Sequence, residues 1–197
     1  PMQIVLEPER PEIDSIWEEY VAILQKDDNY YIHLTDEIGP PSEYNKLCYL
    51  LDNALAKDTV YLIINSPGGI ADAAFMIINS MINSKAKIVG RITGNASSAA
   101  TMIAMYCDEL IVDKFATMMF HNYYHGMEAS GAKMKNYVDF IDGEFTNVVK
   151  EVYKDFLTAE EMHRISSDDK EVWLNEKDLR ERWANKLANR IATDKAE

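Results

Sequence analysis

Apolar residues in the middle of the chain alternate between two spacings, which indicates strands and helices in turn. Short continuous apolar runs, typical of buried strands, occur at residues 30–34, 59–64, 88–92, 109–113 and 117–121. Apolar residues that recur every three or four positions predict helices over residues 44–55, over residues 71–83 and after residue 98. This repeated order of strand, helix and strand predicts a layered α/β core.

Two helical patterns lie outside this core. In residues 1–28 an irregular leader precedes apolar residues at helical spacing, namely Ile13, Ile16, Trp17, Tyr20, Ile23 and Leu24. Residues 132–156 keep helical register for about six turns, with an apolar stripe that includes Phe140 and Val148. A helix of that length is expected to leave the core and meet another surface, so the second pattern predicts a protruding helix.

The C-terminal part completes a single domain. Thr158 and Glu161 have the spacing of a capping box, which predicts the start of a short helix. A strand at residues 172–174 and a final helix from about Asn175 follow, and residues 192–197 are expected to be a frayed tail. Because no linker or low-complexity tract interrupts the chain, we expect residues 1–197 to form one domain.

The chain is acidic, with 33 Asp and Glu against 20 Lys and Arg and a formal charge of −13. This charge repels nucleic acid and anionic membranes, so neither is expected as a partner. Cys48 and Cys107 both lie in apolar helical patterns, which favours buried free thiols over a disulfide and hence a reducing compartment. With no visible signal peptide and no apolar run long enough to span a bilayer, the expected location is the cytoplasm.

Candidate chemistry begins at a glycine-led turn over residues 94–102, between the apolar strand at 88–92 and an apolar helix. The turn carries Ser97 and Ser98. A serine in the first turn of a helix lies beside unpaired backbone N–H groups and the positive end of the helix dipole, which favours a nucleophile whose reaction forms an oxyanion. The alternative is structural: one serine caps the helix, and the small residues allow close packing.

Three further segments bear on the same chemistry. The sequence NSPGG at residues 65–69 ends a strand, where paired glycines let backbone N–H groups face a bound carbonyl, although it is also a common turn signal. His121 ends a later strand and is placed to return beside the serines, although such a histidine is often structural. The acidic residues of loop 168–171 can orient that histidine, or they can simply be solvated.

In these segments, and in the strand at 172–174, the chain resembles the ClpP-type serine peptidases, with similarity over about residues 30–191. In that family the nucleophile is the fifth residue of the glycine-led turn. The resemblance therefore implies that Ser98 is the nucleophile and that His121 is the general base.

The resemblance also assigns the oxyanion hole to the backbone N–H groups of Gly69 and Ala99. The family usually has Met and Gly after the nucleophile, where this chain has Ala99 and Ala100, so the backbone donor is kept while the pocket wall changes. The glycine before the family's last strand corresponds to Lys186. Divergence of this kind resembles the phage and prophage members.

The acid of the implied triad has two candidate positions. Counting back from the strand at 172–174 places Glu171 on the family's aspartate, whereas counting forward from Thr158 places Asp169 there. A residue beside an anchored strand is held better than one in the middle of a polar loop. Glu171 is therefore favoured, Asp169 is second and Asp168 is third.

The resemblance implies a ClpP/crotonase-like spiral of ββα units with a protruding helix, and a serine endopeptidase that needs no metal or organic cofactor. It further implies homo-oligomeric rings that take polypeptide substrates, either with an AAA+ Clp unfoldase or as a phage maturation-type protease without ATP. Two other classes stay open. One is an acyl-CoA enzyme of the crotonase type, which uses similar paired N–H groups, and the other is a catalytically inactive ring or scaffold protein.

Overall fold

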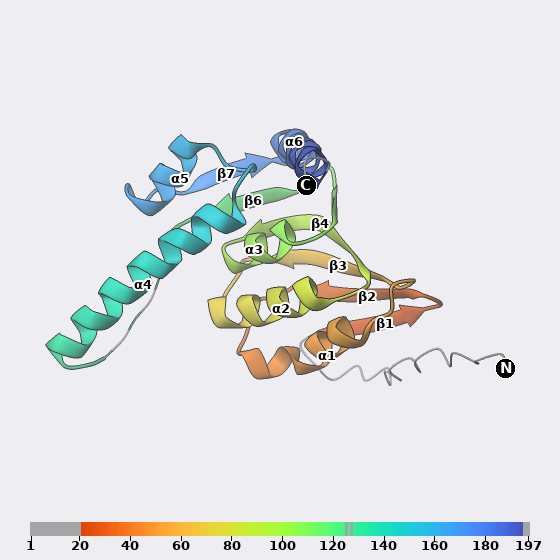
Figure 1. The fold of residues 1–197 in the computed structure, drawn as a ribbon, viewed down its shortest axis with the longest axis horizontal. Helices are drawn as coiled ribbons and strands as arrows, with labels where there is room; N and C mark the ends of the chain where they lie inside the picture. Colours follow the sequence, from red (N-terminus) through yellow and green to blue (C-terminus); the bar gives the residue numbers. More distant parts are fainter. Residues whose placement is uncertain (1–20, 125, 127, 195–197) are drawn as a thin grey trace.

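The computed structural model describes residues 21–124, 126 and 128–194, and its centre is a seven-stranded sheet (Figure 1). The strands are β1 (Ala22–Lys26), β2 (Asn29–Leu34), β3 (Thr59–Ser66), β4 (Lys87–Ser97), β5 (Glu109–Val112), β6 (Thr117–Phe120) and β7 (Val172–Asn175). Strands β2, β3, β4 and β6 are parallel in that order, and β5 also pairs with β4. The antiparallel strands β1 and β7 form the two edges.

Three helices cover one face of the sheet (Figure 1). They are α1 (Asn45–Asn53), α2 (Ala71–Asn83) and α3 (Ala99–Met105), and the short 3-10 helix η1 (Pro41–Tyr44) leads into α1. Successive side chains of a strand face opposite sides, so alternate strand residues enter this layer. Ile32, Leu62 and Ile92 are fully buried. The mixed α/β fold is thus confirmed, and no helix in the described part of the chain is long and apolar enough to cross a membrane.

The first described strand corrects the expected N-terminal helix. Ile23 and Leu24, expected on a helix, lie in β1, which runs antiparallel to β2. Asp27 has a φ of 54°, and this left-handed residue closes the short turn between the two strands. The hairpin satisfies the backbone hydrogen bonds of the segment, so strand pairing overrides the helical spacing of its apolar residues. The rest of that expected helix, within residues 1–20, lies outside the described residues.

The long helix α4 spans Gly131–Val152 and projects away from the sheet (Figure 1). Only its C-terminal end packs on the core, where Val149 and Val152 are buried. Phe140, near its middle, is 64 % exposed. The helix ends before the expected limit at residue 156 because the chain turns at Asp155, whose φ of 62° does not fit an α-helix.

The short helix α5 (Ala159–Ser166) begins at the capping box predicted from the sequence. The hydroxyl oxygen of Thr158 accepts a hydrogen bond from the N–H of Glu161 at 3.2 Å, and the carboxylate of Glu161 accepts one from the N–H of Thr158 at 2.9 Å. Arg182 also donates two hydrogen bonds to Glu161, at 2.6 and 2.8 Å. Mainly because of these bonds from Arg182, the pKa of Glu161 is lowered to about 2.

The final helix α6 (Glu176–Asp194) extends into the segment expected as a tail. Residues 192–194 are helical rather than frayed, and the rest of the expected tail, residues 195–197, lies outside the described residues. Lys186, at the place of the family's glycine before its last strand, lies inside the helix. Lys186 is 7 % exposed and donates a hydrogen bond to the carbonyl of Lys154 at 2.8 Å, and its burial lowers its pKa to about 8. Arg190 likewise binds the carbonyl of Met105 at 3.0 Å. These contacts with neighbouring helix ends hold the segment in helical form.

Candidate active site

Ser98 stands between the end of β4 and the start of α3 in a strained conformation. Its φ is 54° and its ψ is −126°, which is costly for a residue with a Cβ atom. The N–H of Ser98 donates to the carbonyl of Met119 on β6 at 2.9 Å, and its own carbonyl accepts from the N–H of Thr101 at 2.9 Å. In hydrolases with a nucleophile elbow, a sharp strand-to-helix turn of this kind presents the catalytic serine.

The neighbouring Ser97 has different surroundings. It is 3 % exposed, and its hydroxyl donates to the side-chain oxygen of Asn95 at 3.0 Å. Ser98 is half-buried, and its hydroxyl has no hydrogen-bond partner within the part of the chain that the structure describes. Of the two serines, Ser98 is therefore the better candidate for a nucleophile.

Two backbone N–H groups near Ser98 have no hydrogen-bond partner among the described residues. The first belongs to Ala99, the first residue of α3, where helix geometry leaves the N–H group unpaired. The second belongs to Gly69, which lies beside Ile38 in a parallel bridge. The bridge uses the carbonyl of Gly68 and the N–H of Ile70, so the N–H of Gly69 points away from Ile38.

Gly68 allows this loop to approach the serine closely. It has a φ of 89°, and a Cβ atom added to it would lie 2.6 Å from the Cβ of Ser98 and 3.0 Å from the nitrogen of Ala99. Only glycine fits such a position. The N–H of Gly68 itself is bound to the hydroxyl of Ser66 at 3.1 Å, which leaves Gly69 and Ala99 as the available donors.

His121 follows the last residue of β6 and is half-buried. Strands β4 and β6 pair in parallel with Ser97 beside Met119, so the chain brings His121 to the edge of the sheet at which Ser98 turns. The side chains of Ser98 and His121 form no hydrogen bond within the described residues. Catalytic hydrogen bonds are often long or poorly aligned in the absence of substrate, so a serine and a histidine without a direct bond still suit a catalytic pair.

Among the three candidate acids, Glu171 has the best place in the sheet. Strand β7 pairs with β6 with Val172 opposite Phe120, and the next pair in that register is Glu171 and His121. The carboxylate of Glu171 is exposed, however, and accepts a hydrogen bond from the indole N–H of Trp173 at 2.7 Å. In this conformation it does not bind His121.

The other two acids form no hydrogen bond or ion pair with His121 among the described residues. Asp169 is exposed, with a φ of 51°. Asp168 lies 3.7 Å from the ring nitrogen of His163 and 3.9 Å from the ammonium of Lys170. Within the described residues, the structure therefore places Ser98, His121, Gly69 and Ala99 at one end of the sheet, and none of the three candidate acids bonds the histidine.

The remaining candidates for chemistry lack a suitable environment. Cys48 and Cys107 are buried free thiols, and burial raises the pKa of Cys107 to about 12, so it carries no thiolate near neutral pH. Within the described residues no group of three or more His, Cys, Asp or Glu side chains could hold a metal ion.

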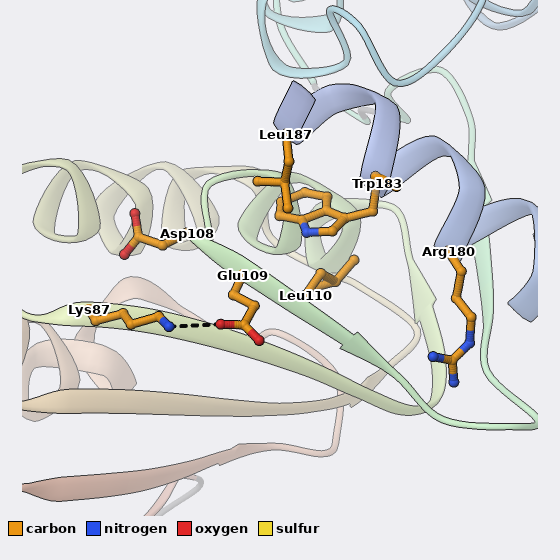
Figure 2. Close-up of a pocket in the computed structure, with 8 residues that line it drawn as sticks. Lys87, Asp108, Glu109, Leu110, Arg180, Trp183 and Leu187 are labelled. Atoms are coloured by element: carbon orange, nitrogen blue, oxygen red, sulfur yellow. Dashed lines mark hydrogen bonds and ion pairs between the residues drawn. The ribbon is translucent and has the colours of Figure 1, made fainter. Parts of the chain in front are cut away.

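A shallow hollow lies between β5 and α6 (Figure 2). One of its walls carries Lys87, which forms an ion pair with Glu109 at 2.8 Å. Lys87 begins β4 and Ser98 follows its last residue, so the hollow and the serine lie at opposite ends of that strand.

Two buried residues beside Ser98 were missed by the sequence analysis. Thr101 lies in the first turn of α3 and Tyr153 caps the C-terminus of α4, and their hydroxyl groups are 2.8 Å apart. Both residues stand in apolar helical patterns, where nothing in the sequence separates a hydrogen-bonding role from ordinary packing.

The comparison with protein families agrees with this geometry. The model of the Clp protease family matches residues 19–182, which include every residue of the candidate site. A comparison with curated proteins gave no match. Because the family model covers most of the chain, the chain belongs to the Clp protease family.

Proposed function

We propose that the protein is a serine peptidase of the ClpP type, with Ser98 as nucleophile and His121 as general base. The main support is the strained turn at Ser98, which lies beside two unpaired N–H groups and at the same sheet edge as His121. A nucleophile, a base and a pair of oxyanion donors are the parts that acyl transfer needs.

In the proposed reaction His121 takes the proton of the Ser98 hydroxyl as the oxygen attacks the carbonyl carbon of a peptide bond. The N–H groups of Gly69 and Ala99 stabilise the negative charge on the former carbonyl oxygen. His121 then gives the proton to the leaving amine, and the acyl group stays on Ser98. Water, activated by His121, hydrolyses this ester and restores the serine.

We propose Glu171 as the acid that orients His121. Its place opposite His121 in the register of β6 and β7 supports this role. To fill it, the carboxylate must leave the indole of Trp173 and bind the imidazole N–H instead. Glu171 is exposed and its side chain can rotate, whereas Asp169 lies farther from β7, which begins at Val172.

We also propose a ring-shaped homo-oligomer that cleaves polypeptides, either beside an AAA+ unfoldase or as a phage maturation-type protease. The exposed apolar residues of α4, which include Phe140 at 64 %, support a role for this helix in assembly. Phe140→Asp should give smaller species in sedimentation velocity, while Asn136→Asp on the same helix should not. Unchanged assembly in the Phe140 variant would place the interface elsewhere.

Peptide turnover by two serine variants tests the proposed activity. Ser98→Ala should reduce turnover of a fluorogenic peptide by about a million-fold, the scale seen when a catalytic serine is removed. Ser97→Ala is the matched control and should keep most of the activity, because successive residues at a helix start point about 100° apart. Equal losses in both variants would refute the assignment, and turnover of acyl-CoA thioesters instead of peptides would indicate a crotonase-type enzyme.

A further inference from the structure

A chain of buried hydroxyl groups leads from the end of α4 to the backbone of Ser98. The hydroxyl of Thr101 lies 2.6 Å from the carbonyl oxygen of Ser98 and 2.8 Å from the hydroxyl of Tyr153. Thr101 is fully buried and Tyr153 is 3 % exposed. At these distances both contacts are well-formed hydrogen bonds that water does not reach.

The chemistry of the three groups fixes the direction of both bonds. A carbonyl oxygen can only accept, so Thr101 gives its single hydroxyl hydrogen to Ser98. Thr101 then has only lone pairs left, and Tyr153 must donate to it. Burial raises the pKa of Tyr153, so its hydroxyl keeps the hydrogen that this bond needs. Tyr153 thus strengthens the bond from Thr101 to Ser98 by polarising it.

The Ser98 carbonyl belongs to the same peptide unit as the N–H of Ala99. The peptide unit is planar and trans, so the two groups point in opposite directions. The backbone N–H and the hydroxyl of Thr101 both donate hydrogen bonds to the Ser98 carbonyl, at 2.9 and 2.6 Å. Holding the carbonyl toward α3 directs the Ala99 N–H outward, where an oxyanion would form.

Tyr153 is itself fixed against the strand that leads to the histidine. Its ring meets the ring of Phe120 edge to face, with centroids 5.1 Å apart and an interplanar angle of 90°. Phe120 is the residue before His121. Tyr153 therefore contacts both the helix that begins at the serine turn and the strand that ends at the histidine.

We propose that Tyr153 and Thr101 are positioning residues, which hold the peptide unit between Ser98 and Ala99 in the orientation that acyl transfer requires. The proposal rests on Ser98 being the nucleophile. A helical threonine commonly bonds a carbonyl of the preceding turn. Here, that carbonyl belongs to a residue with a φ of 54°, and a second hydroxyl from another helix supports the bond.

Rates of Ser98 labelling by a fluorophosphonate test the kinetic consequence. Thr101→Val removes the donor while keeping the shape, and should slow labelling about tenfold. Tyr153→Phe should slow it by a smaller factor, and Thr101→Ser should keep nearly the full rate. The double variant Thr101→Val, Tyr153→Phe should be no slower than Thr101→Val, because Tyr153 acts through Thr101. For peptide turnover, kcat should fall with KM unchanged.

Wild-type labelling rates in both single variants, with only their melting temperatures lowered, would overturn the positioning role. Absence of any label on the wild-type protein would instead overturn the proposed function.

A second measurement tests the positioning role without depending on activity. The dipeptide Ser-Ala occurs once in the sequence, at residues 98–99. Carbonyl-¹³C serine combined with ¹⁵N alanine therefore gives a single carbonyl–amide correlation in the NMR spectrum of the assembled protein.

Loss of a hydrogen bond moves a carbonyl carbon upfield, so Thr101→Val should shift the Ser98 carbonyl signal upfield and displace the Ala99 amide signal. Tyr153→Phe should shift both signals in the same directions by less, and Thr101→Ser should restore them. Signals that stay at their wild-type positions in both Thr101→Val and Tyr153→Phe would contradict the proposal, whatever the activity of the protein.

Discussion

The serine turn and the acidic loop are two parts of one candidate site, and they are held in different ways. The turn at Ser98 is fixed by backbone groups of β6, by α3 and by the close approach of Gly68. The acidic residues 168–171 lie on the surface, where Glu171 binds Trp173 and Asp168 lies near His163. Backbone held by neighbouring strands fixes the nucleophile and the oxyanion donors, whereas the position of the acid depends on exposed side-chain rotations.

Of the two regions, the exposed acidic loop gives the larger expected effect on turnover. If Glu171 rotates to orient His121, Glu171→Gln should lower peptide turnover by about 10⁴-fold, the scale seen when a triad acid is replaced by its amide. Asp169→Asn is the matched control and should keep most of the activity. Fold and oligomeric state, followed by circular dichroism and sedimentation, should be unchanged in both.

The opposite result, with turnover lost only in Asp169→Asn, would transfer the role of the acid to Asp169. Near-normal turnover in both variants would mean that Ser98 and His121 work as a dyad. In that case the acidic loop would have no part in the reaction, and the difference between it and the turn at Ser98 would be larger.

A second effect concerns the fixed part of the site. In Gly68→Ala the added methyl group would lie 2.5 Å from the carbonyl oxygen of Ser97 and 2.6 Å from the Cβ of Ser98. The turn must move, which displaces the Ala99 donor, and turnover should fall by about 10²- to 10³-fold, as when an oxyanion donor is lost. Gly143→Ala, in α4 and with open space around it, should leave turnover unchanged. Full activity in the Gly68 variant would show that the turn is not tightly held.

The smallest effect is on stability and concerns the helix that leads to the acidic loop. The lowered pKa of Glu161, about 2 against an ordinary value of 4.5, means that its stabilising contribution is present above about pH 4.5. It should be lost as the pH falls toward 2. Urea unfolding at pH 6 should show Glu161→Gln to be about 2 kcal/mol less stable than wild type.

At pH 3 the difference in unfolding free energy between wild type and Glu161→Gln should be smaller. At that pH the carboxyl of Glu161 is protonated in the unfolded chain but still ionised in the folded protein, so folding must release a proton. The exposed neighbour offers a control, and Glu160→Gln should differ little from wild type at either pH. A difference for Glu161→Gln that is constant between pH 6 and pH 3 would contradict the role of the ion pair.

Local sequence signals predicted much of the fold because local physics decides those elements. The helix Ala71–Asn83 and the capping box at Thr158 were both predicted, since apolar periodicity and capping hydrogen bonds act within a few residues. Strand β1 was missed because its conformation comes from pairing with β2, which helical spacing does not report.

The same distinction applies to the candidate site. Ser98 and Gly69 stand in short motifs whose backbone geometry follows from the motif itself. The choice between Glu171 and Asp169 depends on how the loop before β7 lies against the end of β6. Counting residues from the two sides of that loop gives two different answers. Thr101 and Tyr153 are 52 residues apart, so no local pattern could connect their hydroxyl groups.

The most direct test of the central claim is to identify the residue that reacts. The wild-type protein is treated with a fluorophosphonate, its intact mass is measured, and the modified residue is located by peptide mapping. We predict one adduct for each chain, attached to Ser98, with no adduct formed by Ser98→Ala and an adduct retained by Ser97→Ala. Attachment to Ser97, or the absence of an adduct on the folded wild-type protein, would contradict the account.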